Sequence, residues 1–171
     1  MGGDITGAKK DYRNHGAKIG NNTVFKNRLC GLLIEIKAIF VLMQKKDIKT
    51  REDVYLLVSS FYEKIRLSKE LGPFFNETIK DWDVHLDNLT TFWESSLFLK
   101  TRYLGNPLEV HVEVDKAHGH AITERHFGLW LNLWIQTIDG LFEGDYAENA
   151  KRRARKMATF LYLKIFEARS N

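Results

Sequence analysis

Apolar residues recur three and four positions apart in four separate stretches of the chain, the spacing that places them on one face of an α-helix. The four faces are, in chain order, Val54, Leu57, Val58, Phe61, Tyr62 and Ile65; Trp82, His85, Leu86, Leu89, Trp93 and Leu97; Phe127, Trp130, Leu131, Trp134, Ile138 and Leu141; and Ala147, Ala150, Ala154, Met157, Ala158, Leu161 and Ile165. Four amphipathic helices with little strand signal predict an all-α domain.

Residues with capping preferences indicate where these helices begin and end. Thr50 and Asp53 have the spacing of a capping box, which predicts a helix start. Gly72 and Pro73 are expected to end this first helix, and Asp145 is the expected N-cap of the fourth.

One stretch follows a different period. Leu108 to Asp115, LEVHVEVD, alternates apolar and polar residues, which taken alone predicts a strand with His111 on its polar face. A lone strand would have no partner in an otherwise helical chain.

The charge distribution divides the chain into two parts. Residues 1–42 contain 7 Lys and Arg, 3 acids and six of the twelve glycines, which leaves 19 basic and 19 acidic residues for residues 43–171. We expect residues 1–42 to be an N-terminal extension, largely disordered, with an apolar helix or strand near residues 29–42. Residues 43–171 are the expected domain. Alternatively, residues 1–42 lie upstream of a protein that begins at Met43.

Cysteine use and hydropathy favour a cytoplasmic protein. The single cysteine, Cys30, cannot form an internal disulfide, and no cysteine pair has the spacing of structural zinc. The longest apolar stretch, Leu29 to Met43, contains Glu35 and Lys37 and is too short for a membrane span. We therefore expect a reducing compartment and no membrane partner.

Four of the six histidines lie in residues 111–126, HVEVDKAHGHAITERH. Imidazole is the commonest metal ligand in proteins, so the cluster suggests a metal site, although a solvated loop is an alternative. A non-haem site would use His111, Asp115, His118 and His120 as ligands. His126 is expected to be an ordinary polar residue near a helix start.

Two polar residues lie on apolar helix faces. Tyr62 shares its face with Phe61 and Ile65, and His85 lies among tryptophans. Each alone is most simply a core residue with a satisfied polar group. Together they favour a pocket with apolar walls and a few donors, suited to a flat and mostly apolar ligand.

Five ordered motifs resemble a known family. FYEKIRLSKELGPFF, DWDVHLDNLTTFW, YLGNPLEVH, HFGLWLNLW and the closing helix, which together run from about Val54 to Ile165, are similar to truncated haemoglobins of the third group, in the globin superfamily. The resemblance implies a shortened globin fold, with two helix pairs packed across each other around haem b. It also implies that the stretch before HFGLW is mostly loop, which contradicts the strand at LEVHVEVD.

The resemblance implies a role for several side chains. The histidine of NPLEVH, His111, would be the proximal iron ligand. Tyr62 of FYEKI and Trp130 of HFGLW would donate hydrogen bonds to a ligand on the distal side, which suits the partial negative charge of bound dioxygen. His85 of DWDVH would be a gate or secondary donor.

Three further pocket residues and one ambiguity follow from the same resemblance. Phe75 would stack on the haem, and Leu89 and Trp93 would follow His85 on its helix face. His111 and Trp130 are nineteen positions apart, which looks long for the family. His118 or His120 is therefore a rival proximal ligand.

The expected function is binding of dioxygen, and of nitric oxide and carbon monoxide, at a histidine-ligated iron. Slow oxygen release would suit nitric oxide dioxygenation, peroxidase-like chemistry or sensing rather than bulk transport, and turnover would need a reductase. Enzymatic activity is left open, since no motif identifies an electron donor.

A basic run offers a third hypothesis. KRRARK, residues 151–156, is typical of a helical nucleic-acid or interaction module. Its apolar neighbours face inward, so we expect these cations on the solvated face of the fourth helix, and no nucleic-acid partner.

Overall fold

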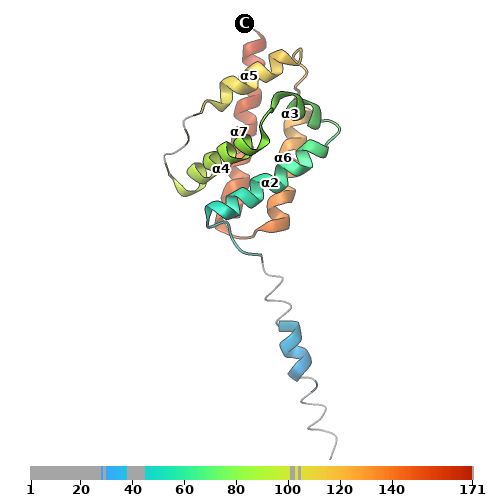
Figure 1. Cartoon of the computed structure of the whole chain (residues 1–171), viewed down its shortest axis with the longest axis vertical. Coiled ribbons are helices and arrows are strands. Elements are labelled where there is room, and N and C mark those ends of the chain that lie inside the picture. The colour runs from blue at the N-terminus through green and yellow to red at the C-terminus, as the bar shows by residue number, and fades with distance from the viewer. Residues whose placement is uncertain (1–27, 29, 38–44, 101–102, 104, 171) are drawn as a thin grey trace, which may run out of the picture. The chain divides into compact units, whose positions relative to one another are not determined.

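The computed structural model describes residues 28, 30–37, 45–100, 103 and 105–170 (Figure 1). They fall into two units, with the boundary between Gln44 and Lys45. In the first unit, residues 30–37 are helical, and Leu32, Leu33 and Ile34 are exposed. Most of the expected extension lies outside the described residues, so its disorder and the domain boundary stay predictions.

The second unit is built from helices, and its described residues contain no strand, which confirms the all-α prediction. In chain order the helices are α2 (Arg51–Leu67), α3 (Gly72–Thr78), α4 (Trp82–Phe98), α5 (Pro107–Ala117), α6 (Glu124–Leu141) and α7 (Asp145–Arg169). α2 packs on α4 and α6 on α7, and these two pairs meet through α2 with α6 and α4 with α7 (Figure 1). Within the described part of the chain, no helix could cross a membrane.

The first helix begins as its capping residues predict. The Thr50 backbone N–H donates to Asp53 Oδ2 over 3.1 Å, and the Asp53 N–H donates to Thr50 Oγ1 over 3.2 Å. All six residues of the predicted α2 face are buried, as is Trp134 on the α6 face. The apolar period therefore identified the side of each helix that forms the core.

Gly72 and Pro73 begin a helix rather than only ending one. α2 has already ended at Leu67, and Pro73 lies in the first turn of α3, where its missing N–H costs no hydrogen bond. A Cβ on Gly72 would lie 2.9 Å from the Arg66 carbonyl oxygen, so glycine permits the close approach of the two helices. The seven-residue α3 is too short to give a periodic signal.

The strand expected at LEVHVEVD is wrong, and so is the loop implied by the family resemblance. This segment lies in α5, which starts at Pro107 with Asn106 as N-cap. Only residues 118–123 connect α5 to α6. An isolated strand would leave its backbone groups without partners, whereas a helix satisfies them internally and packs on α7.

The predicted N-cap of α7 is also wrong. Asp145 is the first helical residue, and Gly144 occupies the N-cap position with φ 137°. The capping carboxylate comes from Asp47, which accepts hydrogen bonds from the backbone N–H groups of Tyr146 (3.0 Å) and Ala147 (2.9 Å). A Cβ on Gly144 would lie 2.5 Å from the Asp47 side chain, so the cap requires glycine there.

Replacing Asp47 with alanine is expected to lower the free energy of unfolding by about 1–2 kcal/mol, the usual cost of losing a helix cap. Asp145→Ala is the matched control and should cost less than about 1 kcal/mol, since it removes only a first-turn charge. Urea unfolding followed by circular dichroism measures both. A larger loss in Asp145→Ala than in Asp47→Ala would contradict the assignment of the cap.

Candidate functional site

All six helices of the second unit contribute to one pocket, which encloses about 820 Å³ not filled by protein atoms, including its open mouth. The lining residues are Tyr62, Leu71, Phe74, Phe75, Leu89, Phe92, Trp93, Tyr103, Pro107, His111, Ile122, His126, Phe127, Trp130, Met157, Ala158 and Leu161. Among these described residues none is Lys, Arg, Asp or Glu, so the walls are apolar and aromatic with a few neutral polar groups.

His111 reaches this pocket from α5 with one ring nitrogen already bonded. Its Nδ1 lies 2.6 Å from the carbonyl oxygen of Pro107. Because a carbonyl can only accept, Nδ1 carries the proton and Nε2 keeps its lone pair. Burial lowers the pKa of His111, and the bond to Pro107 partly opposes this shift. The ring is therefore a neutral imidazole whose Nε2 is available as a ligand.

Tyr62 enters the pocket from α2, which lies apart from α5 in Figure 1. Its side chain is buried, and burial raises the pKa of its hydroxyl, while a hydrogen bond from the Trp130 side chain works in the opposite direction. Phe61 packs edge-on against both rings, with centroids 5.0 Å from Tyr62 and 5.3 Å from Trp130. A protonated phenol and an indole N–H thus lie together in one wall.

His85 stands behind Tyr62 rather than in the pocket lining. Its ring centroid is 5.2 Å from that of Tyr62 and 5.7 Å from that of Trp82. Among the described residues its buried Nε2 has no hydrogen-bond partner. Burial lowers the pKa of His85, and the nearby His111 acts in the same direction because two protonated rings would repel each other. The ring is therefore neutral, and a polar atom close to the pocket is left without a partner.

The pocket gathers His111 and most of the other predicted site residues. These are Tyr62, Phe75, Leu89, Trp93 and Trp130, with His85 in the layer behind. The apolar faces of α4 and α6 that the sequence predicted contribute residues to the pocket lining. The rings of Phe75 and Tyr62 are 5.7 Å apart.

His118 and His120 do not line the pocket. His118 Nδ1 lies 2.8 Å from the Val114 carbonyl, and its Nε2 is 3.4 Å from Glu77. His120 Nδ1 is 2.9 Å from Asp115 Oδ2, and its side chain is half-exposed. The two rivals to His111 are thus engaged elsewhere.

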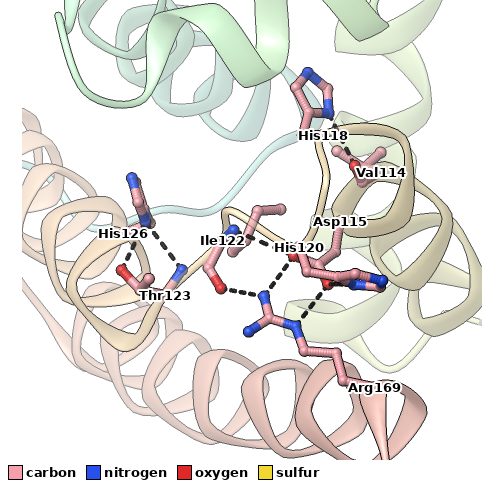
Figure 2. A network of polar contacts seen from close by, with 8 residues as sticks. All are labelled: Val114, Asp115, His118, His120, Ile122, Thr123, His126 and Arg169. Atoms are coloured by element: carbon pink, nitrogen blue, oxygen red, sulfur yellow. Dashed lines mark hydrogen bonds and ion pairs between the residues drawn. The ribbon is translucent and has the colours of Figure 1, made fainter. Parts of the chain in front are cut away.

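Asp115 is the centre of a polar network that joins α5, the following loop and the end of α7. Figure 2 shows Arg169 reaching Asp115 and the carbonyl of Ile122. Arg169 Nε and Nη2 donate to Asp115 over 2.9 and 2.6 Å, and the Ile122 N–H donates over 3.1 Å. Burial acts to raise the pKa of Asp115, but the hydrogen bonds from Arg169, His120 and Ile122 outweigh it and hold the pKa below its usual value.

This network bears on the non-haem metal hypothesis. Both carboxylate oxygens of Asp115 already accept hydrogen bonds, and His118 faces Glu77 instead of Asp115. The described residues contain no group of three or more His, Cys, Asp or Glu arranged to hold a metal ion. The geometry gives the four expected ligands no common centre.

The basic run of α7 is only partly solvated. Lys151 is buried, and its Nζ lies 2.7 Å from Asp139 and 2.5 Å from Glu148. Arg153 reaches Ser96 on α4 over 3.1 Å. The expectation that the five cations of this run lie on the outer face is therefore wrong for Lys151, because ion pairing satisfies its ammonium group beneath the surface.

This chain and its fold are similar to known proteins. No family model matches the chain. A group 3 truncated hemoglobin, ctb, of Campylobacter jejuni subsp. jejuni serotype O:2 (strain ATCC 700819 / NCTC 11168) is 27% identical over 113 residues, covering 64% of this chain and 85% of that protein. The crystal structure of group III truncated hemoglobin from Campylobacter jejuni matches with a TM-score of 0.64 and 25% identity, over 71% of this chain and 95% of that one.

The fold is that of a group III truncated haemoglobin. The recognition made from sequence motifs is thereby confirmed. α2 with α4 and α6 with α7 are the two helix pairs of this truncated globin fold.

The pocket fits a haem. An iron porphyrin is flat and mostly apolar, and its iron accepts a protein nitrogen as axial ligand. The aromatic walls suit the ring, and His111 offers one free imidazole nitrogen, oriented by the bond from its other nitrogen to Pro107.

Sequence reasoning did not identify Phe92, Tyr103 or His126 as pocket residues. Phe92 lies one position outside the predicted stripe of α4, and Tyr103 lies in the connection to α5. Met157 and Leu161 were assigned to the core face of α7. Both residues also line the pocket. Their position on the apolar face of α7 could have indicated this, because the same helix face contributes to the core and to the pocket wall.

Proposed function

We propose that residues 43–171 bind haem b through Nε2 of His111 and hold dioxygen, and also nitric oxide, beside Tyr62 and Trp130. The observation that carries this proposal is that one apolar pocket is lined by two kinds of group from different helices. One is an oriented, neutral imidazole, and the other is a hydroxyl with an indole N–H. Haem, when bound, supplies the iron at which the small ligand binds.

The distal residues of this proposal act as donors. Bound dioxygen carries partial negative charge, so the Tyr62 hydroxyl and Trp130 N–H stabilise it, most strongly where water is excluded. Because burial raises the pKa of Tyr62, its hydroxyl keeps its proton at neutral pH. His85, with its free Nε2 behind Tyr62, is a gate or secondary donor. Phe75, Leu89 and Trp93 pack on the porphyrin.

Tight retention of oxygen favours chemistry or sensing over bulk transport. Nitric oxide dioxygenation and peroxidase-like reactions both need electrons, which a reductase in a cytoplasmic setting would supply. Carbon monoxide is a further expected ligand. Residues 1–42 are proposed as an extension outside this domain.

An optical spectrum of the purified protein with added haem tests the proposal. We expect an intense Soret band that shifts when carbon monoxide is added to the reduced protein. Absence of haem uptake by the folded chain would rule the function out. Salt-dependent retention of DNA, lost on neutralising residues 151–156, would support the nucleic-acid alternative instead.

Tyr62→Phe and Trp130→Phe should each speed dioxygen release by about tenfold or more, since hydrogen bonds to charged groups are worth about 1.5–3 kcal/mol. The double variant should release oxygen faster than either single one. Laser photolysis or stopped-flow measures the dissociation rates, and Tyr55→Phe, on the exposed side of α2, is the control. Equal rates in all variants would remove both residues from the mechanism.

A further inference from the structure

His126 lines the pocket with one ring nitrogen engaged, as His111 does. Of the four clustered histidines, these two alone are among the described lining residues. His118 and His120 are bonded outside it. His126, the first residue of the motif HFGLW, is therefore a pocket residue as well as a polar residue at a helix start.

The ring of His126 is held in one tautomer. The backbone N–H of Thr123 donates to His126 Nδ1 over 3.0 Å, and Thr123 Oγ1 lies 2.9 Å from the same atom. An atom that accepts a backbone N–H cannot carry a proton, so the neutral ring bears its proton on Nε2. Figure 2 shows that the second ring nitrogen points away from Thr123. The Nε2–H of His126 takes no part in the capping contacts with Thr123 and can donate to another group.

The surroundings of His126 fix the ring in place. Its centroid is 5.0 Å from Phe74, another lining residue, in an edge-on contact. The loop before it is anchored at Ile122, whose N–H binds Asp115 and whose carbonyl binds Arg169. The donor is thus presented at a defined place in the pocket wall.

We propose that Nε2–H of His126 binds a carboxylate of the porphyrin. This rests on the proposed haem function. Haem b is apolar except for its iron and two propionate carboxylates, and a carboxylate near an apolar wall requires donors. The described lining offers no Lys or Arg for this purpose. Tyr62 and Trp130 hydrogen-bond each other and are assigned above to the small ligand, and His111 is assigned to the iron. His126 is therefore the remaining histidine donor of the described lining.

The test compares the affinity of the full-length apoprotein for haem with its affinity for haem dimethyl ester, in which the carboxylates are masked. His126→Glu keeps an acceptor for the helix cap but removes the donor. His126→Phe keeps an aromatic ring against Phe74. In both variants the preference for haem over the diester should fall about tenfold or more, because a hydrogen bond to a charged acceptor is lost.

His118→Gln is the matched control, and it should leave this preference unchanged. Thermal unfolding of each apoprotein separates loss of the cap from loss of the donor, since capping acts equally on both ligands. An unchanged preference in both His126 variants, with normal haem uptake by the unmodified chain, would overturn this inference alone. Absence of haem uptake by the unmodified chain would overturn the proposed function as well.

Discussion

His111→Ala is expected to abolish histidine-ligated haem binding. Replacing even an outer partner of a metal ligand typically costs about 10–100-fold in affinity, so loss of the ligand itself should weaken haem binding by more than about 100-fold. Any haem retained by the apolar walls should show an altered Soret band. Haem titration of the apoprotein gives the affinity, and the ferrous spectrum gives the coordination.

Two further experiments separate ligation from general damage to the pocket. In His111→Gly, added imidazole should restore the spectrum, because the small ring can occupy the space that the side chain vacates. His118→Ala and His120→Ala should keep the normal spectrum, since neither residue lines the pocket. Unaltered coordination in His111→Ala, or its loss in either control, would transfer the ligand role to another histidine.

Asp115→Ala should lower the free energy of unfolding of the apoprotein by about 3 kcal/mol, the lower end of the range for breaking a buried ion pair. Asp115 is 2% exposed and Arg169 27% exposed, so the guanidinium left behind is partly hydrated. The Ile122 N–H also loses its acceptor. Glu70→Ala is the control: it removes the exposed Arg125 pair and should cost no more than about 1 kcal/mol.

The same carboxylate predicts a pH dependence. The pKa of Asp115 is lower in the folded protein than in the unfolded chain, where it is about 3.9. Its stabilising contribution is therefore complete above about pH 4 and is lost as the pH falls through the folded value. Asp115→Asn should show a shallower loss of unfolding free energy below pH 4. An acid limb as steep as that of the unmodified protein would contradict the role of this network.

The amino-acid sequence by itself determined the helices that build the core. The faces of α2, α4, α6 and α7 follow a local period of 3.6 residues, and burying those faces requires no knowledge of the partners. The Thr50–Asp53 capping box is equally local. Ordered motifs then allowed recognition of the globin family and named Tyr62, Trp130 and His111 as candidates, whose roles stay predictions.

Only the tertiary structure decided which distant groups meet. Asp47 caps a helix about 100 residues later in the chain, and Asp115 pairs with Arg169 across 54 positions. Such contacts leave no period in the sequence, because they depend on how packed helices bring loops and ends together. α5 formed because an unpaired strand could not satisfy its backbone. The same packing turned His126 toward the pocket and His118 and His120 away from it, which sixteen consecutive residues with four histidines could not reveal.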